Sequence, residues 1–221
     1  MDQKKPYESK AVSNEPLQDH DPPQVEGPSN RRRRHPRFPD HEVVTLYPGE
    51  YFVSHKPLVL STLLGSCVGV CMRDPYVGVG GMNHFMLPAP GHSASSGAWS
   101  VKTRYGSYAM ETLINGILKH GGQRSRLEVK VFGGAKLYEG GGDIGAINAQ
   151  WVLEYLDREG LRPIASDLGK DYARSVYYYT DTGRVLMKSG DSADRGRAVE
   201  AEKVFTALYG PYTAKSDATL F

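Results

Sequence analysis

The sequence predicts an α/β fold of the α+β type, a layered sandwich of mostly antiparallel β-strands with two or three helices. Two observations support this prediction. Short runs rich in valine, leucine, phenylalanine and tyrosine are separated by Pro-Gly, Gly-Ser and Asp-Pro turn signals. Apolar residues at helical spacing occur between some of these runs, and such helices bury their apolar faces by packing against a sheet.

Strands dominate the predicted fold. Residues 127–132 alternate between apolar and polar side chains as a half-buried strand does, and residues 163–166 form a short extended piece. The last two predicted strands, 175–180 and 185–188, flank an Asp-Thr-Gly-Arg sequence that is typical of a hairpin. Five further strand-like runs precede these, at residues 43–47, 51–54, 58–62, 67–72 and 77–85.

Helices are predicted between and after the strands. Apolar residues from Tyr105 to Leu118 recur at spacings of three and four, and a pair of glycines at 121 and 122 ends the pattern. Asp143 can cap a second helix, which stops at Gly160. A third helix is predicted over residues 198–208.

Residues 1–40 are predicted to be a disordered leader rich in proline and arginine. They hold 7 of the 14 prolines, 1 of the 25 glycines and only four large aliphatic or phenylalanine residues. Such a segment cannot bury enough apolar surface to offset the entropy lost on ordering it. Residues 41–210 are predicted to form a single globular domain, and residues 211–221 a C-terminal tail.

The composition excludes several classes of protein. The formal charge is +2, from 27 basic and 25 acidic residues, so no overall field requires a nucleic-acid or membrane partner. Two cysteines are too few for a disulfide scaffold, and the longest uncharged stretch, 57–72, is too short for a bilayer span. We therefore expect a soluble cytoplasmic protein. Acidic residues earlier in the leader nearly cancel the four arginines at 31–34, which favours a solvated linker end over a nucleic-acid or lipid contact.

The segment that carries chemistry begins with a cysteine in a turn. Cys67 follows Gly65 and Ser66 and opens a predicted strand, and His84 lies 17 residues later, within the next strand. An Arg-Asp-Pro turn between the two strands allows antiparallel pairing. That pairing can place the thiol and the imidazole within hydrogen-bond reach.

These residue types suit nucleophilic catalysis. A free thiol, with a pKa of about 8.5, is only a few per cent thiolate at neutral pH. A neighbouring imidazolium lowers this pKa and later gives a proton to the leaving group. The N–H groups of the Gly65, Ser66 and Cys67 turn could hold the oxyanion of a tetrahedral intermediate. A third polar side chain must fix the imidazole tautomer, and Ser61 and Thr62 are the candidates.

Other interpretations of these residues are less favoured. Cys71 lies inside an apolar strand with no turn beside it, which is typical of inert, buried cysteines. The spacing of Cys67, Cys71 and His84 matches neither a common zinc site nor a dithiol redox site, so we expect no metal and no cofactor. The glycine-rich residues 132–142 lack an ordered phosphate-binding motif, which favours a loop that lines one wall of a cleft.

Several separate segments carry a family resemblance. The string LGSCV occupies residues 64–68, GGMNHFMLP residues 80–88, FGGA residues 132–135 and RSV residues 174–176. In this order the strings resemble the bacterial chemotaxis family CheD, and the resemblance covers roughly residues 47–188. CheD-like proteins are chemoreceptor glutamine deamidases. The implied fold is an α/β sandwich similar to the catalytic domain of cytotoxic necrotizing factor toxins.

The resemblance also implies roles for individual residues. Cys67 would be the nucleophile and His84 the general acid/base. The family's third catalytic position, usually a threonine, falls six residues before the cysteine, at Ser61, with the adjacent Thr62 as the fallback. The implied reaction converts a glutamine to glutamate through a Cys67 thioester and releases ammonia, and the same thioester could arise from a receptor methyl ester.

The implied substrate is a glutamine on the cytoplasmic helical region of a methyl-accepting chemotaxis receptor. A CheC-type phosphatase is a further partner that the resemblance suggests. The alternative function is a non-catalytic adaptor that binds receptors or CheC. A cysteine protease or a transglutaminase would share the acyl-enzyme step but fits the full set of motifs less well.

Overall fold

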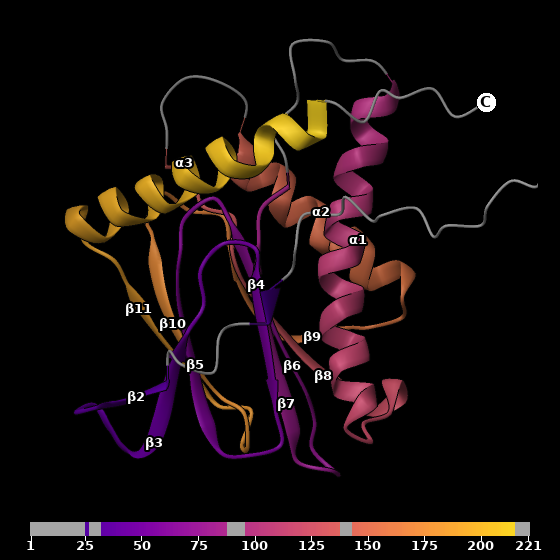
Figure 1. The fold of residues 1–221 in the computed structure, drawn as a ribbon, viewed down its shortest axis with the longest axis vertical. Helices are drawn as coiled ribbons and strands as arrows, with labels where there is room; N and C mark the ends of the chain where they lie inside the picture. Colours follow the sequence, from indigo (N-terminus) through magenta and orange to yellow (C-terminus); the bar gives the residue numbers. More distant parts are fainter. Residues whose placement is uncertain (1–24, 27–31, 88–95, 138–142, 215–221) are drawn as a thin grey trace, which may run out of the picture.

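Two β-sheets pack face to face in the computed structural model, which describes residues 25–26, 32–87, 96–137 and 143–214. Two α-helices lie along one side of the sandwich and a third crosses its end (Figure 1). Most neighbouring strands are antiparallel. The predicted layered α+β sandwich is therefore confirmed.

The larger sheet has the strand order β1-β4-β7-β6-β8-β9. Its central strands pair antiparallel, and the pair at each edge is parallel. In chain order, its strands are β1 (Val25–Glu26), β4 (Glu50–Ser54), β6 (Val68–Asp74), β7 (Val79–Phe85), β8 (Glu128–Gly133) and β9 (Pro163–Leu168).

The smaller sheet has the strand order β11-β10-β5-β3-β2, so β5 lies at its centre. Side chains alternate between its two faces: Leu60 and Leu64 of β5 join the main core, whereas Val59 packs with Phe38 in a separate cluster on the other face. In chain order, its strands are β2 (Arg32–His35), β3 (Phe38–Thr45), β5 (Leu58–Leu64), β10 (Arg174–Tyr179) and β11 (Val185–Ser189).

Helices α1 (Ser96–Lys119) and α2 (Ile144–Arg158) cover the outer face of the larger sheet. The amide of Asn83 on β7 donates to a backbone carbonyl of α1 at 3.0 Å. Phe85, also on β7, meets Trp151 of α2 edge-on. The helix N-cap predicted at the start of α2 is confirmed, because the carboxylate at position 143 accepts a backbone N–H of the first turn.

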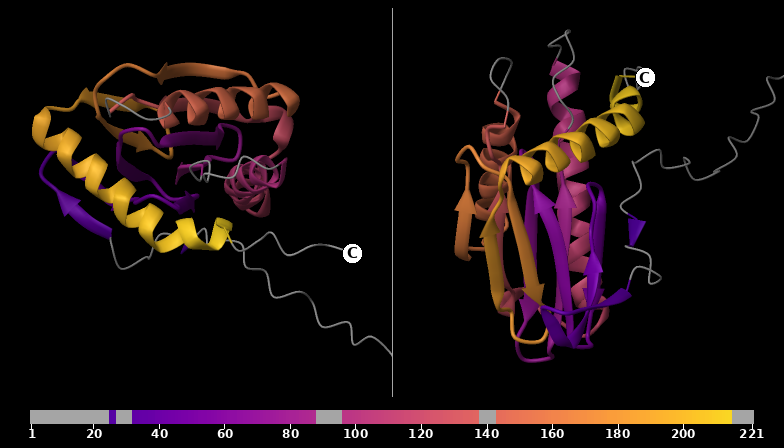
Figure 2. Two further views of the ribbon diagram at one scale, coloured as in Figure 1. Left: turned by 90° about the horizontal axis from the view of Figure 1, so that it is seen from above. Right: turned by 90° about the vertical axis from the view of Figure 1, so that its left-hand side faces the viewer.

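Helix α3 (Ser192–Ala214) lies across one end of the two sheets (Figure 2). Its Ala198 packs in a small apolar cluster with Ala135 and Leu137, which follow β8. The helix is longer than the predicted residues 198–208. None of the described helices combines the length and the apolar character needed to cross a bilayer.

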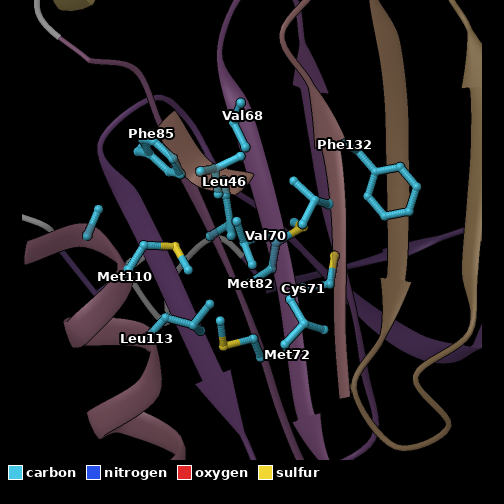
Figure 3. Close-up of a cluster of buried hydrophobic side chains, with 14 of the residues drawn as sticks. Leu46, Val68, Val70, Cys71, Met72, Met82, Phe85, Met110, Leu113 and Phe132 are labelled. Carbon is cyan, nitrogen blue, oxygen red and sulfur yellow. The ribbon is translucent and has the colours of Figure 1, made fainter. Parts of the chain in front are cut away.

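The main core fills the space between the sheets and the space under α1 and α2. Figure 3 shows Met110 and Leu113 of α1 meeting side chains of the larger sheet, among them Val70 and Phe85. Because β6 and β7 are covered on both faces, their side chains are buried along almost their whole length. Polar groups on these two strands must therefore find partners inside the protein.

Some described elements extend beyond the predicted domain bounds of residues 41 and 210. Strand β2 and the first residues of β3 lie before residue 41, so part of the predicted leader belongs to the smaller sheet. The main reason is pairing: β3 lies parallel beside β5, and β2 adds to its other side. At the other end, α3 continues past residue 210. Residues 1–24, 27–31 and 215–221 lie outside the described residues.

Candidate active site

Cys67 lies in a turn that joins β5 of the smaller sheet to β6 of the larger one. Three hydrogen bonds fix this turn: Gly134 N–H donates to the Cys67 carbonyl, Ala135 N–H to the Gly65 carbonyl, and the Asn148 amide to the Ser66 carbonyl, each at 2.8 Å. Gly134 and Ala135, which follow β8, thus pack directly against this turn, whereas residues 138–142 of the predicted cleft-lining loop lie outside the described residues. The turn that carries the thiol is therefore held by the backbone after β8 and by the Asn148 side chain of α2.

His84 lies on β7, opposite Gly69 of β6. The predicted antiparallel pairing of these strands is confirmed. Cys67 is two residues before Gly69, which makes Cys67 and His84 diagonal neighbours on one face of the strand pair. A Cβ placed on Gly69 would approach Leu64 of β5, so this face is turned toward the smaller sheet. The strand register therefore brings Cys67 and His84 to the same end of this strand pair, but among the described residues no hydrogen bond joins the thiol to His84 Nε2.

Thr62 of β5 holds the imidazole of His84. Its Oγ1 lies 2.7 Å from His84 Nδ1 and donates its own hydrogen to the Leu46 carbonyl at 2.8 Å. A hydroxyl has only one hydrogen to donate, so Nδ1 must carry the ring proton and donate to Thr62. In a neutral imidazole, this leaves Nε2 unprotonated. Nε2 is the nitrogen that a general base needs.

Ser61 does not make this contact. Its Oγ pairs with Thr45 Oγ1 at 3.0 Å, on the face of β5 that also carries Val59. Successive residues of a strand point to opposite faces, so Ser61 and Thr62 cannot both reach His84. The orienting contact that the resemblance places at Ser61 is made by Thr62 instead.

The imidazole is buried and uncharged in this arrangement. His84 is 2% exposed, and among the described residues its Nε2 has no hydrogen-bond partner. Burial lowers the pKa of His84 to about 3, although a hydrogen bond to the Leu46 carbonyl acts in the opposite direction. Near neutral pH His84 is therefore a neutral base and not an imidazolium.

The backbone N–H groups predicted to hold a substrate oxyanion contact a carboxylate of the protein itself, that of Glu202. One oxygen of the Glu202 carboxylate accepts the backbone N–H groups of Ser66, at 2.7 Å, and Cys67, at 3.3 Å. The other oxygen accepts the Ser66 hydroxyl at 2.7 Å. Glu202 lies on α3, about 135 residues away along the chain. The sequence contains no motif around Glu202 that would have linked it to this site.

The protonation state of Cys67 differs from the sequence-based expectation. Burial, followed by the negative charge of Glu202, raises the pKa of the thiol well above its ordinary value. Cys67 is only 1% exposed. A neighbouring imidazolium was expected to lower this pKa, but His84 is neutral here and the charged group that acts on the thiol is the Glu202 carboxylate. In the observed arrangement Cys67 is a protonated thiol.

Cys71 behaves as an inert buried cysteine should. It lies within β6, is fully buried in the core, and burial raises its pKa far above that of a free thiol. Within the described ranges, no group of three or more histidine, cysteine, aspartate or glutamate side chains is arranged to hold a metal ion.

The comparisons with known proteins agree with the motifs. The family model described as "CheD chemotactic sensory transduction" matches residues 86–189. A protein of Herminiimonas arsenicoxydans is 42% identical over 82% of this chain and 90% of its own length. A protein of Rhodopseudomonas palustris is 44% identical over 87% of this chain and 90% of its own length. A third relative, from Thiobacillus denitrificans, is 41% identical over 82% of this chain and 91% of its own length.

All three relatives bear the name "Probable chemoreceptor glutamine deamidase CheD". The identities extend over most of both chains, so the similarity is not confined to one motif. With the predicted resemblance confirmed, this chain belongs to the CheD family.

Proposed function

We propose that this protein is a glutamine deamidase that acts on chemoreceptors, with Cys67 as nucleophile, His84 as general base and acid, and Thr62 as the residue that orients His84. One observation carries the chemistry: the Thr62 hydroxyl fixes the proton on His84 Nδ1, which leaves Nε2 unprotonated on the strand face that Cys67 shares. The names of the relatives supply the reaction and its substrate class.

The reaction begins from a neutral thiol and a neutral imidazole. His84 Nε2 takes the thiol proton as the Cys67 sulfur adds to the carboxamide carbon of glutamine. The carbonyl oxygen becomes an oxyanion, which the N–H groups of Ser66 and Cys67 stabilise. The C–N bond then breaks, and the imidazolium returns its proton to the nitrogen, so that ammonia leaves and a thioester remains.

Hydrolysis of the thioester completes the cycle. His84 removes a proton from water as the water oxygen adds to the acyl carbon. The C–S bond breaks, the sulfur regains a proton, and a glutamate side chain is released. A receptor methyl ester would give the same thioester with methanol as the leaving group, so methyl-ester hydrolysis is a second reaction of the same site.

The substrate in this proposal is a glutamine in the cytoplasmic helical region of a methyl-accepting chemotaxis receptor, and the protein acts in the cytoplasm. The product glutamate is an anionic side chain that a receptor methyltransferase can esterify. Residues around the site must recognise the folded receptor, since a free carboxamide offers few contacts.

The test uses the full chain and a purified cytoplasmic receptor fragment. Ammonia release and the conversion of amide to acid, followed by peptide mass spectrometry, should occur with the wild-type protein and with Cys71→Ala. Both signals should disappear with Cys67→Ala. Full activity of Cys67→Ala would contradict the proposal, whereas Cys71→Ala controls for the loss of a buried thiol.

A non-catalytic adaptor is the second candidate, and the burial of Cys67 and His84 favours it. In this case the protein binds receptors, or a CheC-type phosphatase, without modifying them. Receptor binding and a cellular chemotaxis phenotype that are both unchanged in Cys67→Ala would support the adaptor. A phenotype lost together with deamidation would support the enzyme.

A further inference from the structure

The Glu202 carboxylate is bound as a substrate oxygen would be. It accepts three hydrogen bonds from the turn, two of them from the backbone N–H groups assigned above to the oxyanion. Its charge also lies close enough to the Cys67 thiol to raise the thiol pKa. A glutamate side chain is the product of the proposed reaction, and Glu202 presents the same chemical group to the same donors.

Helix α3 is fitted closely over this site. A Cβ on Gly65 would lie 2.6 Å from Glu202 Oε1 and 3.2 Å from the Ala198 side chain, so the glycine allows α3 to approach the turn. One turn further along the helix, the Phe205 ring packs near Tyr105 of α1, with ring centroids 6.1 Å apart. Glu202 is thus held between two apolar contacts of α3.

A glutamine on another protein cannot reach the buried thiol while α3 stays in this position. Cys67 and His84 are 1% and 2% exposed, and Glu202 fills the donors that the reacting carboxamide needs. Receptor modification therefore requires α3 to move. The helix also lies outside residues 86–189, the segment matched by the family model.

We propose that α3 is an autoinhibitory helix, and that Glu202 occupies the subsite of the reacting side chain as an intramolecular product mimic. This inference rests on the proposed deamidase function. Displacement of α3 removes the carboxylate from the N–H groups of the turn and opens the space between the sheets to the substrate. It also removes two causes of the raised Cys67 pKa, burial and the adjacent negative charge.

Alkylation of Cys67 by iodoacetamide tests the covering role of α3 without relying on activity. Glu202→Ala should accelerate Cys67 alkylation about ten- to a hundredfold, as expected for loss of hydrogen bonds to a charged group. Glu200→Ala is the matched control, because Glu200 is an exposed glutamate on the same helix. It should react at the wild-type rate. Cys71 is buried in the core, so its labelling would indicate that the whole sandwich opens, and it should stay unlabelled in all variants.

An unchanged rate for Glu202→Ala would overturn the proposal. So would equal acceleration of Cys67 and Cys71, because the whole sandwich would then have loosened. Phe205→Ala provides an independent check. It weakens the packing of α3 without changing the turn, and it should also accelerate alkylation of Cys67 but not of Cys71.

A second substitution tests the product mimic itself. In Glu202→Gln, a carboxamide lies in the proposed substrate subsite, and Cys67 should convert it back to glutamate within the same molecule. Peptide mass spectrometry should show this conversion at a rate independent of protein concentration. It should be absent from Glu202→Gln combined with Cys67→Ala, and the glutamine of Glu200→Gln should persist.

The possible failures can be told apart. If the wild-type protein deamidates a receptor but the glutamine introduced at position 202 persists, the product-mimic proposal is wrong. If neither is deamidated although Glu202→Ala accelerates alkylation selectively, the deamidase function fails and the covering role of α3 stands.

Discussion

The hydroxyl of Thr62 decides which nitrogen of His84 can act as a base. Because its one hydrogen is given to the Leu46 carbonyl, the hydroxyl can only accept from Nδ1. Removal of the hydroxyl takes one hydrogen-bond partner from each of two buried groups, the His84 ring and the Leu46 carbonyl, and allows the ring to turn or change tautomer. In the proposed mechanism, Thr62 is thus a positioning residue that acts through His84.

Thr62→Ala should lower kcat for receptor deamidation about ten- to a hundredfold, since an unpaired buried polar group costs about 1–3 kcal/mol. Thr62→Ser should retain most of the activity, because it keeps the hydroxyl. Ser61→Ala is the matched control on the opposite face of β5 and should be near wild type. A large loss in Ser61→Ala with normal activity in Thr62→Ala would reverse the assignment.

Single residues of the site could be predicted to different degrees. Cys67 in its Gly-Ser turn and His84 on the next strand follow from local sequence, because a short connection between two strands fixes their register. The choice between Ser61 and Thr62 depends on which face of β5 is turned toward the larger sheet. Both faces of this strand are largely buried, so its apolar pattern does not tell them apart. Glu202 could not be found, because its contact with the turn joins segments far apart in the sequence.

At the level of elements, α1 and α2 pack closely enough to require a glycine. A Cβ on Gly106 of α1 would lie 2.5 Å from Cζ2 and 2.7 Å from Cζ3 of the Trp151 ring on α2. Trp151 is itself fixed against Phe85 and Tyr155, so the ring cannot easily move away. The approach of the two helices over the larger sheet depends on this contact.

Gly106→Ala should therefore lower the free energy of unfolding by about 1–3 kcal/mol, despite the better helix propensity of alanine. Gly196→Ala in α3 is the control, because a Cβ there meets no atom within 4 Å. It should be neutral or stabilise the protein by up to about 1 kcal/mol. Denaturant unfolding measures both changes, and a stabilised Gly106→Ala variant would contradict the close packing.

Most elements could be predicted because their apolar patterns are local. Strands β4 to β8 and helix α2 appear close to where periodicity and turn residues place them, whereas α1 ends as predicted but begins at Ser96, well before the predicted pattern at Tyr105. Strand β2 was missed because its sequence, Arg-Arg-Arg-His, has no apolar alternation and is ordered by pairing with β3. The extent of α3 was underestimated, because Gly196 near its start, and a Gly-Pro pair at 210 and 211, are typical of helix ends.

At the level of the whole molecule, the buried His84 links stability to pH. Its pKa is about 3 in the folded protein and about 6.5 in an unfolded chain. Between these values the unfolded state binds the proton and the folded state does not. The contribution of His84 to stability is therefore present above pH 6.5 and falls as the pH is lowered toward 3.

The buried carboxyl of Asp74 affects stability only at lower pH. Burial alone would raise its pKa, but hydrogen bonds from Arg126 and two backbone N–H groups lower it to about 2.

The free energy of unfolding should therefore decrease by up to about 1.4 kcal/mol for each pH unit between 6 and 4 because of His84 alone. His84→Gln removes the titrating group, and its stability should depend less steeply on pH over this range. Denaturant unfolding at several pH values gives both slopes, so the comparison does not depend on the absolute stability of the variant. Equal slopes would show that His84 is not buried as a neutral ring.

The attachment of α3 to the end of β11 makes its carboxylate a tethered ligand. A tether of this kind gives an effective concentration in the millimolar range, which dilution cannot reduce. The observed affinity for any receptor is then the intrinsic affinity multiplied by the fraction of molecules in which the Glu202 carboxylate has left the turn. A signal that alters this fraction would change the rate at every receptor glutamine by the same factor and leave the choice among glutamines untouched.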